Sequence, residues 1–235
     1  MARHAAIAAA LLMAASTPAL AQGITGGQLG IEYAAPVDGS DFGGTTYSGG
    51  LEYGINRQFS VAVDASGYLP DNLDTDFSSL TLHGIYHLSD EASVGVFAGR
   101  DSVEDASANL YGIEGGMELM GGTVEGYIGQ VDGDIDDATL FGLSGVYDLR
   151  PNISVIGNLD VANTDDTTLS QAAVGAQYQL DGGPAFYAKI GNVTAEFAGD
   201  DESQAFIGIG ATIAFGAERG TTFDQRSLFE VVPGF

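Results

Sequence analysis

The chain has 235 residues, with 7 Lys and Arg against 32 Asp and Glu, and a formal net charge of −25 at pH 7. This charge makes nucleic acid and anionic membrane surfaces unsuitable partners. Cysteine is absent, which excludes disulfides and thiolate metal sites. A hydrophobic content of 45% nevertheless separates the chain from disordered acidic proteins.

Residues 1–21 have the features of a secretory signal peptide. They combine a basic start at Arg3 and His4, an apolar run over 5–15 and a small-residue cleavage site ending at Ala21. The apolar run is too short to span a bilayer as an anchor. We therefore expect an exported protein. Loss of Arg3 leaves 7 − 1 = 6 basic residues against 32 acidic ones.

A nine-residue alternating pattern occurs six times in the rest of the chain. Its first copy, 47–55, reads Tyr-x-Gly-x-Leu-x-Tyr-x-Ile. The other copies are 80–88, 111–119, 141–149, 172–180 and 207–215. Strict period two over nine residues is strand geometry, with one apolar face and one polar or small face. A spacing of about 30 residues leaves room for a second strand and a loop, so each unit is expected to be a β-hairpin.

Six further strands are expected between these copies, which gives about twelve strands in total. They are 28–35, 58–69, 93–99, 123–131, 152–161 and 185–197. Each copy is followed by a tight turn such as Asn56-Arg57 or Gly121-Gly122. Each is preceded by a longer polar loop, such as 36–44 or 101–108, and most of these loops are rich in Asp.

Short turns at one end and longer loops at the other, on an even number of strands of about ten residues, are typical of outer-membrane barrels. In this pattern the chain resembles the Gram-negative outer-membrane β-barrel proteins of the small porin-like type, over residues 22–215. The resemblance implies a single antiparallel, transmembrane up-and-down β-barrel of about twelve strands over 22–216, located in the cell outer membrane. It also implies short periplasmic turns, long acidic extracellular loops, and contact with outer-membrane lipid and lipopolysaccharide. The alternative is a soluble secreted β-protein with its apolar face inward.

Three observations favour an apolar outer face. The opposite face is rich in Gly and Ala, which would make a poorly solvated exterior. Twelve strands enclose more space than these apolar side chains would fill. Aromatic residues recur near the short turns, where an interfacial girdle belongs. The expected girdle is Tyr53, Tyr86, Tyr147, Tyr178 and Phe215.

The polar face should then line a lumen. The pore-lining candidates are Glu32, Glu52, Asp64, His83, His87, Glu114, Glu118, Glu125, Asp148, Asp160 and Lys189. Eight carboxylates face one fixed cation in this set, so we expect a water-filled channel that prefers cations. The predicted function is passive, weakly cation-preferring diffusion of small hydrophilic solutes. The alternative is a plugged, non-conducting structural or adhesive barrel whose acidic loops contact lipopolysaccharide, divalent ions or a partner.

The sequence indicates no catalytic, cofactor or metal site. His83 and His87 lie four residues apart on one strand, too far apart to share a metal ligand, and are interpreted as lumen-lining residues. The acidic run 132–137 begins like an EF-hand loop, but Asp137 occupies the glycine position and Leu143 the glutamate position. A Ser-His-acid constellation is also absent, so no enzyme is expected.

Residues 217–235 form a C-terminal tail, expected on the periplasmic side. Asp224 is predicted to cap a short helix over 225–232, and the tail is predicted to tuck into the periplasmic mouth as a partial plug. Outer-membrane barrels end on a Phe that the barrel-assembly machinery reads. Phe235 matches that pattern, although Pro233 suits a final strand poorly, and Phe215 is the alternative signal.

Overall fold

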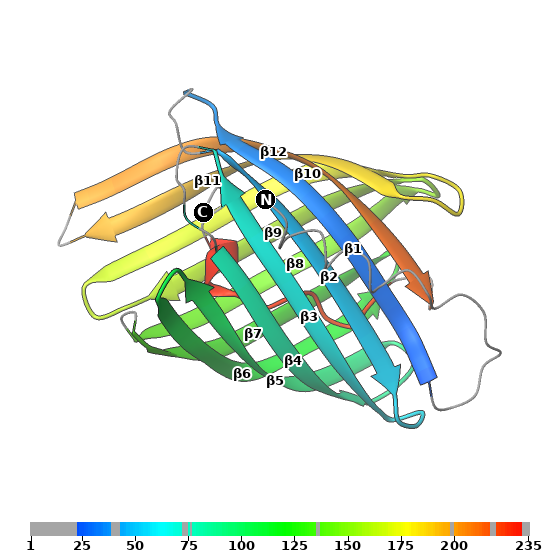
Figure 1. Ribbon diagram of the computed structural model, residues 1–235. Helices are drawn as coiled ribbons and strands as arrows, with labels where there is room; N and C mark the ends of the chain where they lie inside the picture. Colours follow the sequence, from blue (N-terminus) through cyan, green and yellow to red (C-terminus); the bar gives the residue numbers. More distant parts are fainter. Residues whose placement is uncertain are drawn as a thin grey trace, which may run out of the picture.

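The computed structural model describes residues 23–38, 43–71, 75, 77–134, 137–197, 200–216 and 220–231. The predicted signal peptide and Phe235 lie outside these residues. The described chain forms twelve strands and one short 3-10 helix (Figure 1). They are β1 (Gly23–Pro36), β2 (Gly44–Gly54), β3 (Phe59–Pro70), β4 (Phe77–His87), β5 (Ala92–Val103), β6 (Ala106–Leu119), β7 (Gly122–Gly133), β8 (Ala138–Arg150), β9 (Ile153–Asn163), β10 (Thr167–Gln179), β11 (Ala185–Phe197), β12 (Asp200–Gly216) and η2 (Leu228–Val231).

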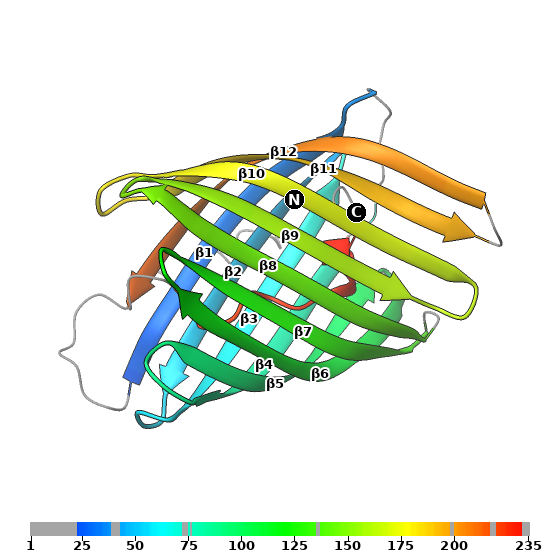
Figure 2. The same ribbon diagram turned by 180° about the vertical axis from the view of Figure 1, so that it is seen from behind.

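The strands form one closed antiparallel barrel, which confirms the predicted fold class. Each strand pairs with its neighbours in sequence, and β1 closes the ring by pairing with β12 from Gly26↔Gly216 to Pro36↔Phe206. Figures 1 and 2 show the tilted strands from opposite sides. The strands have 11 to 17 residues, which meets or exceeds the roughly 9–11 that a tilted strand needs to cross a bilayer. No described helix is long and apolar enough to cross a membrane.

The side-chain alternation places the apolar face outward, as predicted. On β4, Leu80 and Leu82 point outward and are exposed, Leu82 with 58% of its surface accessible. The alternate residues Thr81 and His83 point inward and are buried, His83 with only 2% accessible. The same alternation runs along β3, where Val61 and Val63 are exposed. The outer surface is therefore a belt of large apolar side chains, which a barrel presents to lipid.

Aromatic side chains extend this belt at both ends. We call the end with the β2–β3 and β4–β5 connections the turn end, and the opposite end the loop end. The predicted girdle residues lie near the turn end, where Tyr53, Tyr147 and Tyr178 are exposed and Tyr86 packs against Phe59 with ring centroids 4.9 Å apart. Phe215 is the penultimate residue of β12 at the same end. A second set toward the loop end was not anticipated: Tyr33, Tyr47, Tyr111 and Phe141 are also exposed.

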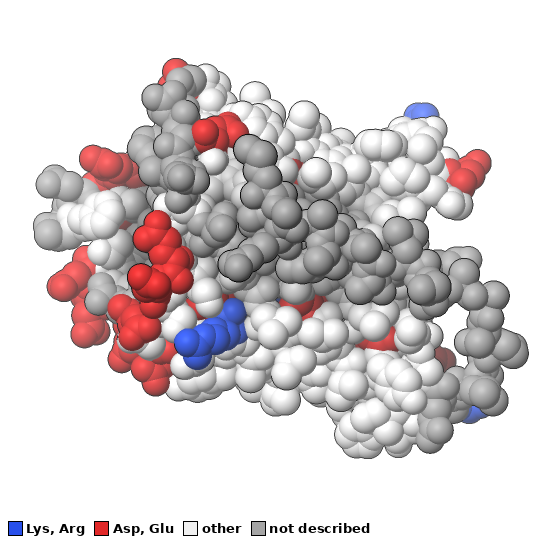
Figure 3. Space-filling model, in the orientation of Figure 1, with Lys and Arg blue, Asp and Glu red and all other residues white. Residues whose placement is uncertain are grey.

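At the loop end, the strands extend into segments that were predicted from the sequence to be loops. β5 runs to Val103 and β6 begins at Ala106, so only Glu104 and Asp105 remain of the expected 101–108 loop. Asp101 pairs with Ala108 inside the ladder. The loop end is therefore made of shorter connections than expected, although acidic side chains still gather there, on the left of Figure 3.

Residues 220–231, which we call the lumen tail, lie inside the barrel (Figure 1, red). Gly216 ends β12 with φ +85°, and Gly220 begins the lumen tail with φ +82°. Both values lie in the left-handed region that favours glycine. A Cβ at Gly26 of β1 would overlap the carbonyl oxygen of Gly220, so glycine there allows the tail to pass close to the wall.

Candidate functional site: the lumen and its tail

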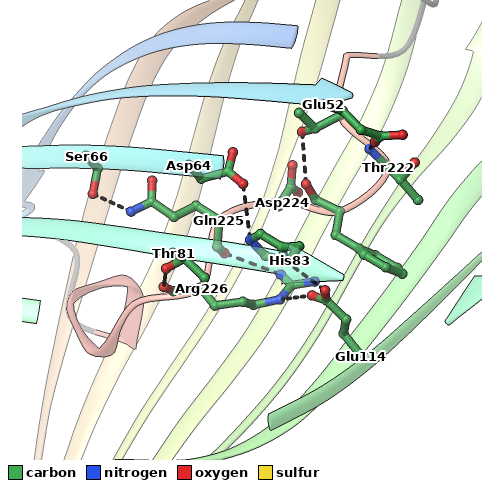
Figure 4. A network of polar contacts seen from close by, with 12 residues as sticks. Glu52, Asp64, Ser66, Thr81, His83, Glu114, Thr222, Asp224, Gln225 and Arg226 are labelled. Atoms are coloured by element: carbon green, nitrogen blue, oxygen red, sulfur yellow. Dashed lines mark hydrogen bonds and ion pairs between the residues drawn. The ribbon is translucent and has the colours of Figure 1, made fainter. Parts of the chain in front are cut away.

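The lumen tail follows the inner wall from the turn end to the loop end. Near the turn end, the Thr222 N–H donates to Glu52 Oε2 at 2.7 Å. Further along, Gln225 Nε2 donates to Ser66 Oγ at 2.6 Å (Figure 4). Near the loop end, the Leu228 N–H donates to Asp101 Oδ2 at 2.6 Å. The tail thus reaches well beyond the periplasmic mouth expected for it, because the polar inner wall offers acceptors along most of its length.

Arg226 is the central anchor of the tail. Its Nε donates to Glu114 Oε2 at 3.0 Å and its Nη1 to Glu125 Oε1 at 3.1 Å. Its guanidinium carbon lies 4.6 Å from the ring centroid of Tyr127, and the residue is 2% exposed. Desolvation opposes the charged form, but the carboxylates of Glu125 and Glu114 raise the pKa of Arg226 above its ordinary value. Arg226 is therefore a fixed cation inside the barrel.

His83 of β4 extends this network along the same side of the barrel, from Glu114 on β6 to Asp64 on β3. Its Nδ1 lies 2.8 Å from Glu114 Oε1, in hydrogen-bonding geometry. Its Nε2 lies 3.1 Å from Asp64 Oδ2, as an ion pair without good hydrogen-bond geometry. Both ring nitrogens face carboxylates, an arrangement that suits the doubly protonated ring. Figure 4 shows Arg226, Glu114, His83 and Asp64 as one connected chain of charges.

Glycines on the inner wall make room for the tail. The Phe223 ring is 1% exposed and packs with Ala62 and Ile85. A Cβ added to Gly95 would lie 2.8 Å from this ring, and one added to Gly116 would lie 3.3 Å from it. The small residues of the polar phase thus form a socket for an aromatic side chain.

The tail ends in η2 near the loop end. The helix begins at Leu228, not at residue 225, and its cap is Ser227 rather than Asp224: Ser227 Oγ accepts the Phe229 N–H at 3.0 Å. Residues 225 and 226, which were expected in the helix, instead bind Ser66 and Glu114 of the wall through their side chains, and the helical turn starts after them. The buried side chain of Val231 then joins an apolar cluster on the inner wall. This cluster contains Phe97, Ala108, Leu110, Tyr127, Val131, Ala138, Leu140, Ala162 and Val231.

The tail occupies only part of the lumen. Its anchored part contacts β2, β3, β5, β6 and β7, while η2 packs against β9 and β10 at the loop end. A cavity of about 330 Å³ remains toward the loop end, and one of about 600 Å³ remains toward the turn end. The two cavities adjoin, because they share lining residues from β1, β7, β8, β9, β11 and β12. Asp224 is exposed and lines both cavities from the tail side.

The structure places all eleven pore-lining candidates on the inner face. Glu52, Asp64, His83, Glu114 and Asp160 are buried there. Glu32, Glu118, Glu125, Asp148 and Lys189 line the cavities. Lys189 Nζ pairs with Glu32 Oε1 at 2.8 Å, and Tyr187 donates to the same carboxylate.

The remaining candidate, His87, is separate from the charge network around His83. Its ring nitrogens lie 2.7 Å from Ser60 Oγ and 2.9 Å from Ser93 Oγ, and Glu52 is 3.9 Å away. The two histidines have different partners. Among the described residues, no group of three or more His, Asp or Glu is arranged to hold a metal ion.

Sequence reasoning missed four charged groups of the lumen. Asp101 was expected in a loop, but it lies on the inner face of β5, where Ser227 and Leu228 donate to it. Asp224, Arg226 and Glu230 come from the tail and line the loop-end cavity. Burial inside the barrel raises the pKa of Glu230 well above its ordinary value, and nearby Asp160 raises it further. In the sequence, only the many glycines on the inward-facing side of the strands indicate that another segment fills part of the lumen.

No protein-family model and no curated protein matches the chain. Solved structures do match. The KdgM porin, also solved in complex with disordered oligogalacturonate, gives a TM-score of 0.60 at 10% identity over 80% of this chain and 99% of that chain. The COG4313 outer membrane channel from Pseudomonas putida F1 gives 0.60 at 13% identity, over 86% and 100%. The CymD monoaromatic hydrocarbon channel gives 0.54 at 10% identity, over 83% and 89%.

These three neighbours are porins or channels by name, and at such identities the likeness establishes the fold. The chain has the porin-like fold of the Gram-negative outer-membrane β-barrel proteins. A closed ladder with an outward apolar belt and aromatic residues at both ends is the form in which a sheet crosses an outer membrane.

Proposed function

We propose that this protein is an outer-membrane channel for passive diffusion of small hydrophilic solutes, with a weak preference for cations. The observation that carries the proposal is the pair of adjoining cavities beside the lumen tail. Their walls carry carboxylates, amides and hydroxyls, and an interior of this kind holds water rather than lipid. Solutes would pass beside the tail, along the strands β1, β7, β8, β9, β11 and β12 that line both cavities.

The charge of the lumen supports the preference for cations. The tail adds Asp224, and β5 adds Asp101, to the eight carboxylates expected from the sequence. Arg226 and Lys189 are the fixed cations that oppose them among the described lumen residues. Rings of carboxylates favour cations in channels, and this lumen keeps a clear excess of them.

The tail limits the size of the solutes. Because it occupies part of the lumen, cavities of about 330 and 600 Å³ remain in place of an open tube. The KdgM porin, which has the same fold, was solved with a disordered oligogalacturonate, and this supports the passage of hydrophilic molecules. Smaller solutes would suit the present chain.

A liposome-swelling assay tests this function. Purified protein is reconstituted into liposomes, which are diluted into isotonic solutions of glycerol, glucose, a disaccharide, lysine or glutamate. We expect rates that fall steeply with size and are higher for lysine than for glutamate. Liposomes that swell no faster than protein-free ones would contradict the proposal.

A non-conducting structural barrel is the second candidate, and the tail network favours it. Arg226, His83 and Phe223 are almost fully buried in contacts with the wall, which would suit a permanent plug. Swelling that appears only after removal of the tail would identify this second function.

The arrangement of the ends supports an orientation in the membrane. The start of β1 and the end of β12 both lie at the turn end, which we assign to the periplasm. The acidic loop end would then face outward, where divalent ions could bridge its carboxylates to lipopolysaccharide phosphates. We further propose that a C-terminal Phe delivers the chain to the barrel-assembly machinery, through Phe235 or through Phe215 at the end of β12.

A further inference from the structure

We infer that Asp224, supplied by the lumen tail, is the main determinant of ion selectivity in this barrel. The inference rests on the proposed channel function and deepens it. The selectivity-determining charge would then belong to the segment that narrows the lumen, and not to the strands that form its wall.

Asp224 lies where the two cavities of the lumen adjoin. It lines both the loop-end and the turn-end cavity, so any solute that passes from one to the other must pass beside it. Its neighbours in the chain point elsewhere: Phe223 is buried in its glycine socket and Gln225 donates to Ser66 of β3. This alternation holds the backbone on one wall and directs the Asp224 side chain to the open side.

The other carboxylates along the shared path are already compensated. Glu32 pairs with Lys189 at 2.8 Å, and Glu125 pairs with Arg226 at 3.1 Å. The backbone N–H of Asp224 donates to Glu125, but its own carboxylate makes no hydrogen bond or ion pair with any described residue. Asp224 therefore presents an unpaired carboxylate to the solute, whereas its two acidic neighbours on the shared path each have a cationic partner.

The test measures reversal potentials of the full mature chain in planar bilayers across a KCl gradient. Asp224→Asn removes the charge and keeps both the size of the side chain and the backbone bond to Glu125. We expect the permeability to potassium to fall about fivefold at low salt, the Boltzmann factor for two unit charges near contact in water. The ratio of potassium to chloride permeability should fall further, because chloride is no longer repelled. Asp224→Lys should move the preference toward chloride.

Two controls separate this role from general effects. Asp90→Asn makes the same charge change on the exposed turn between β4 and β5, and should change the permeability ratio much less. Raising the salt to about 1 M, where the Debye length is about 3 Å, should bring wild type and Asp224→Asn together, since the effect is electrostatic. A difference that persists at 1 M would indicate a steric role and overturn the inference.

The outcomes also separate this inference from the proposed function. A wild-type barrel that passes no current overturns both. A wild-type barrel that conducts with a cation preference unchanged in Asp224→Asn overturns only the role of Asp224.

Discussion

Replacing Arg226 by Gln should release the lumen tail from the wall. The guanidinium links the tail to Glu114 and Glu125, whose side chains are 0% and 15% exposed. Gln cannot supply the charge, so Glu114 would be left buried with His83 as its remaining cationic partner. The wall would then favour a state in which the tail leaves and water enters.

The size of this effect follows from the burial of the pair. Removal of one partner of a buried ion pair typically costs about 3–5 kcal/mol, and the partial exposure of Glu125 places this case near the lower end. At about 1.4 kcal/mol for each factor of ten, a loss of ~3 kcal/mol raises the ratio of undocked to docked tail by roughly 100-fold.

Thiol labelling can measure this ratio, because the chain contains no cysteine. Ser227 is 1% exposed, so a Ser227→Cys variant reports tail release through its reaction with a water-soluble maleimide. When reclosing is faster than labelling, the rate follows the population of the open state. We expect Arg226→Gln to accelerate labelling by about 100-fold.

A second substitution provides the matched control for this experiment. Adding Glu114→Gln to Arg226→Gln removes one of the two carboxylates that have lost the guanidinium and should restore part of the protection. Equal labelling rates with and without Arg226→Gln would refute the assignment of Arg226 as the anchor.

Three further predictions concern the tail, the buried histidine and the outer surface. Deletion of 217–235 should raise single-channel conductance in protein refolded in detergent; unchanged conductance with an intact barrel would exclude a blocking role. His83→Asn should lower the free energy of unfolding in urea by about 2–3 kcal/mol, because buried Asp64 loses its cationic partner and buried Glu114 loses one of its two. His87→Asn, which loses two neutral serine partners and a contact with Glu52 at 3.9 Å, should cost about 1 kcal/mol, and equal losses would contradict the charge network. Leu82→Arg on the lipid face should cost about 2–4 kcal/mol, against about 0–1 for Met120→Arg at the turn end, and the reverse order would invert the membrane assignment.

The barrel itself could be predicted because its signal is local. The strict alternation in segments such as 80–88 specifies both a strand and the face that each side chain takes. Because the period is two, the phase that puts Leu82 outward also puts His83 inward, so the inner-face candidates could be named residue by residue. Six repeats of one hairpin then imply an even strand number.

The strand ends were less predictable because a polar residue can belong either to a solvent-exposed loop or to the inner face of a strand that lines a lumen. The polar residues around Asp101 predict a loop, yet in the structure Asp101 lies in a strand and accepts two hydrogen bonds from the tail. Its place in β5 therefore depends on a segment more than 120 residues later in the chain. A short local window contains no information about such a partner.

The tail is the clearest example of this limit. Arg226 and Asp224 lie in a segment without strand periodicity, and their positions depend on where the wall offers Glu114, Glu125 and the Phe223 socket. Only the assembled barrel defines that surface. The sequence therefore predicts a plug-forming tail in outline, while its depth and contacts come from tertiary structure.

Single-channel recording of the refolded mature chain in a planar bilayer tests most directly whether water fills the space beside the docked tail. Discrete current steps, with Ser227→Cys still protected from labelling, are the predicted result. A correctly inserted, heat-modifiable barrel that gives no steps until residues 217–235 are removed would show that the tail closes the lumen.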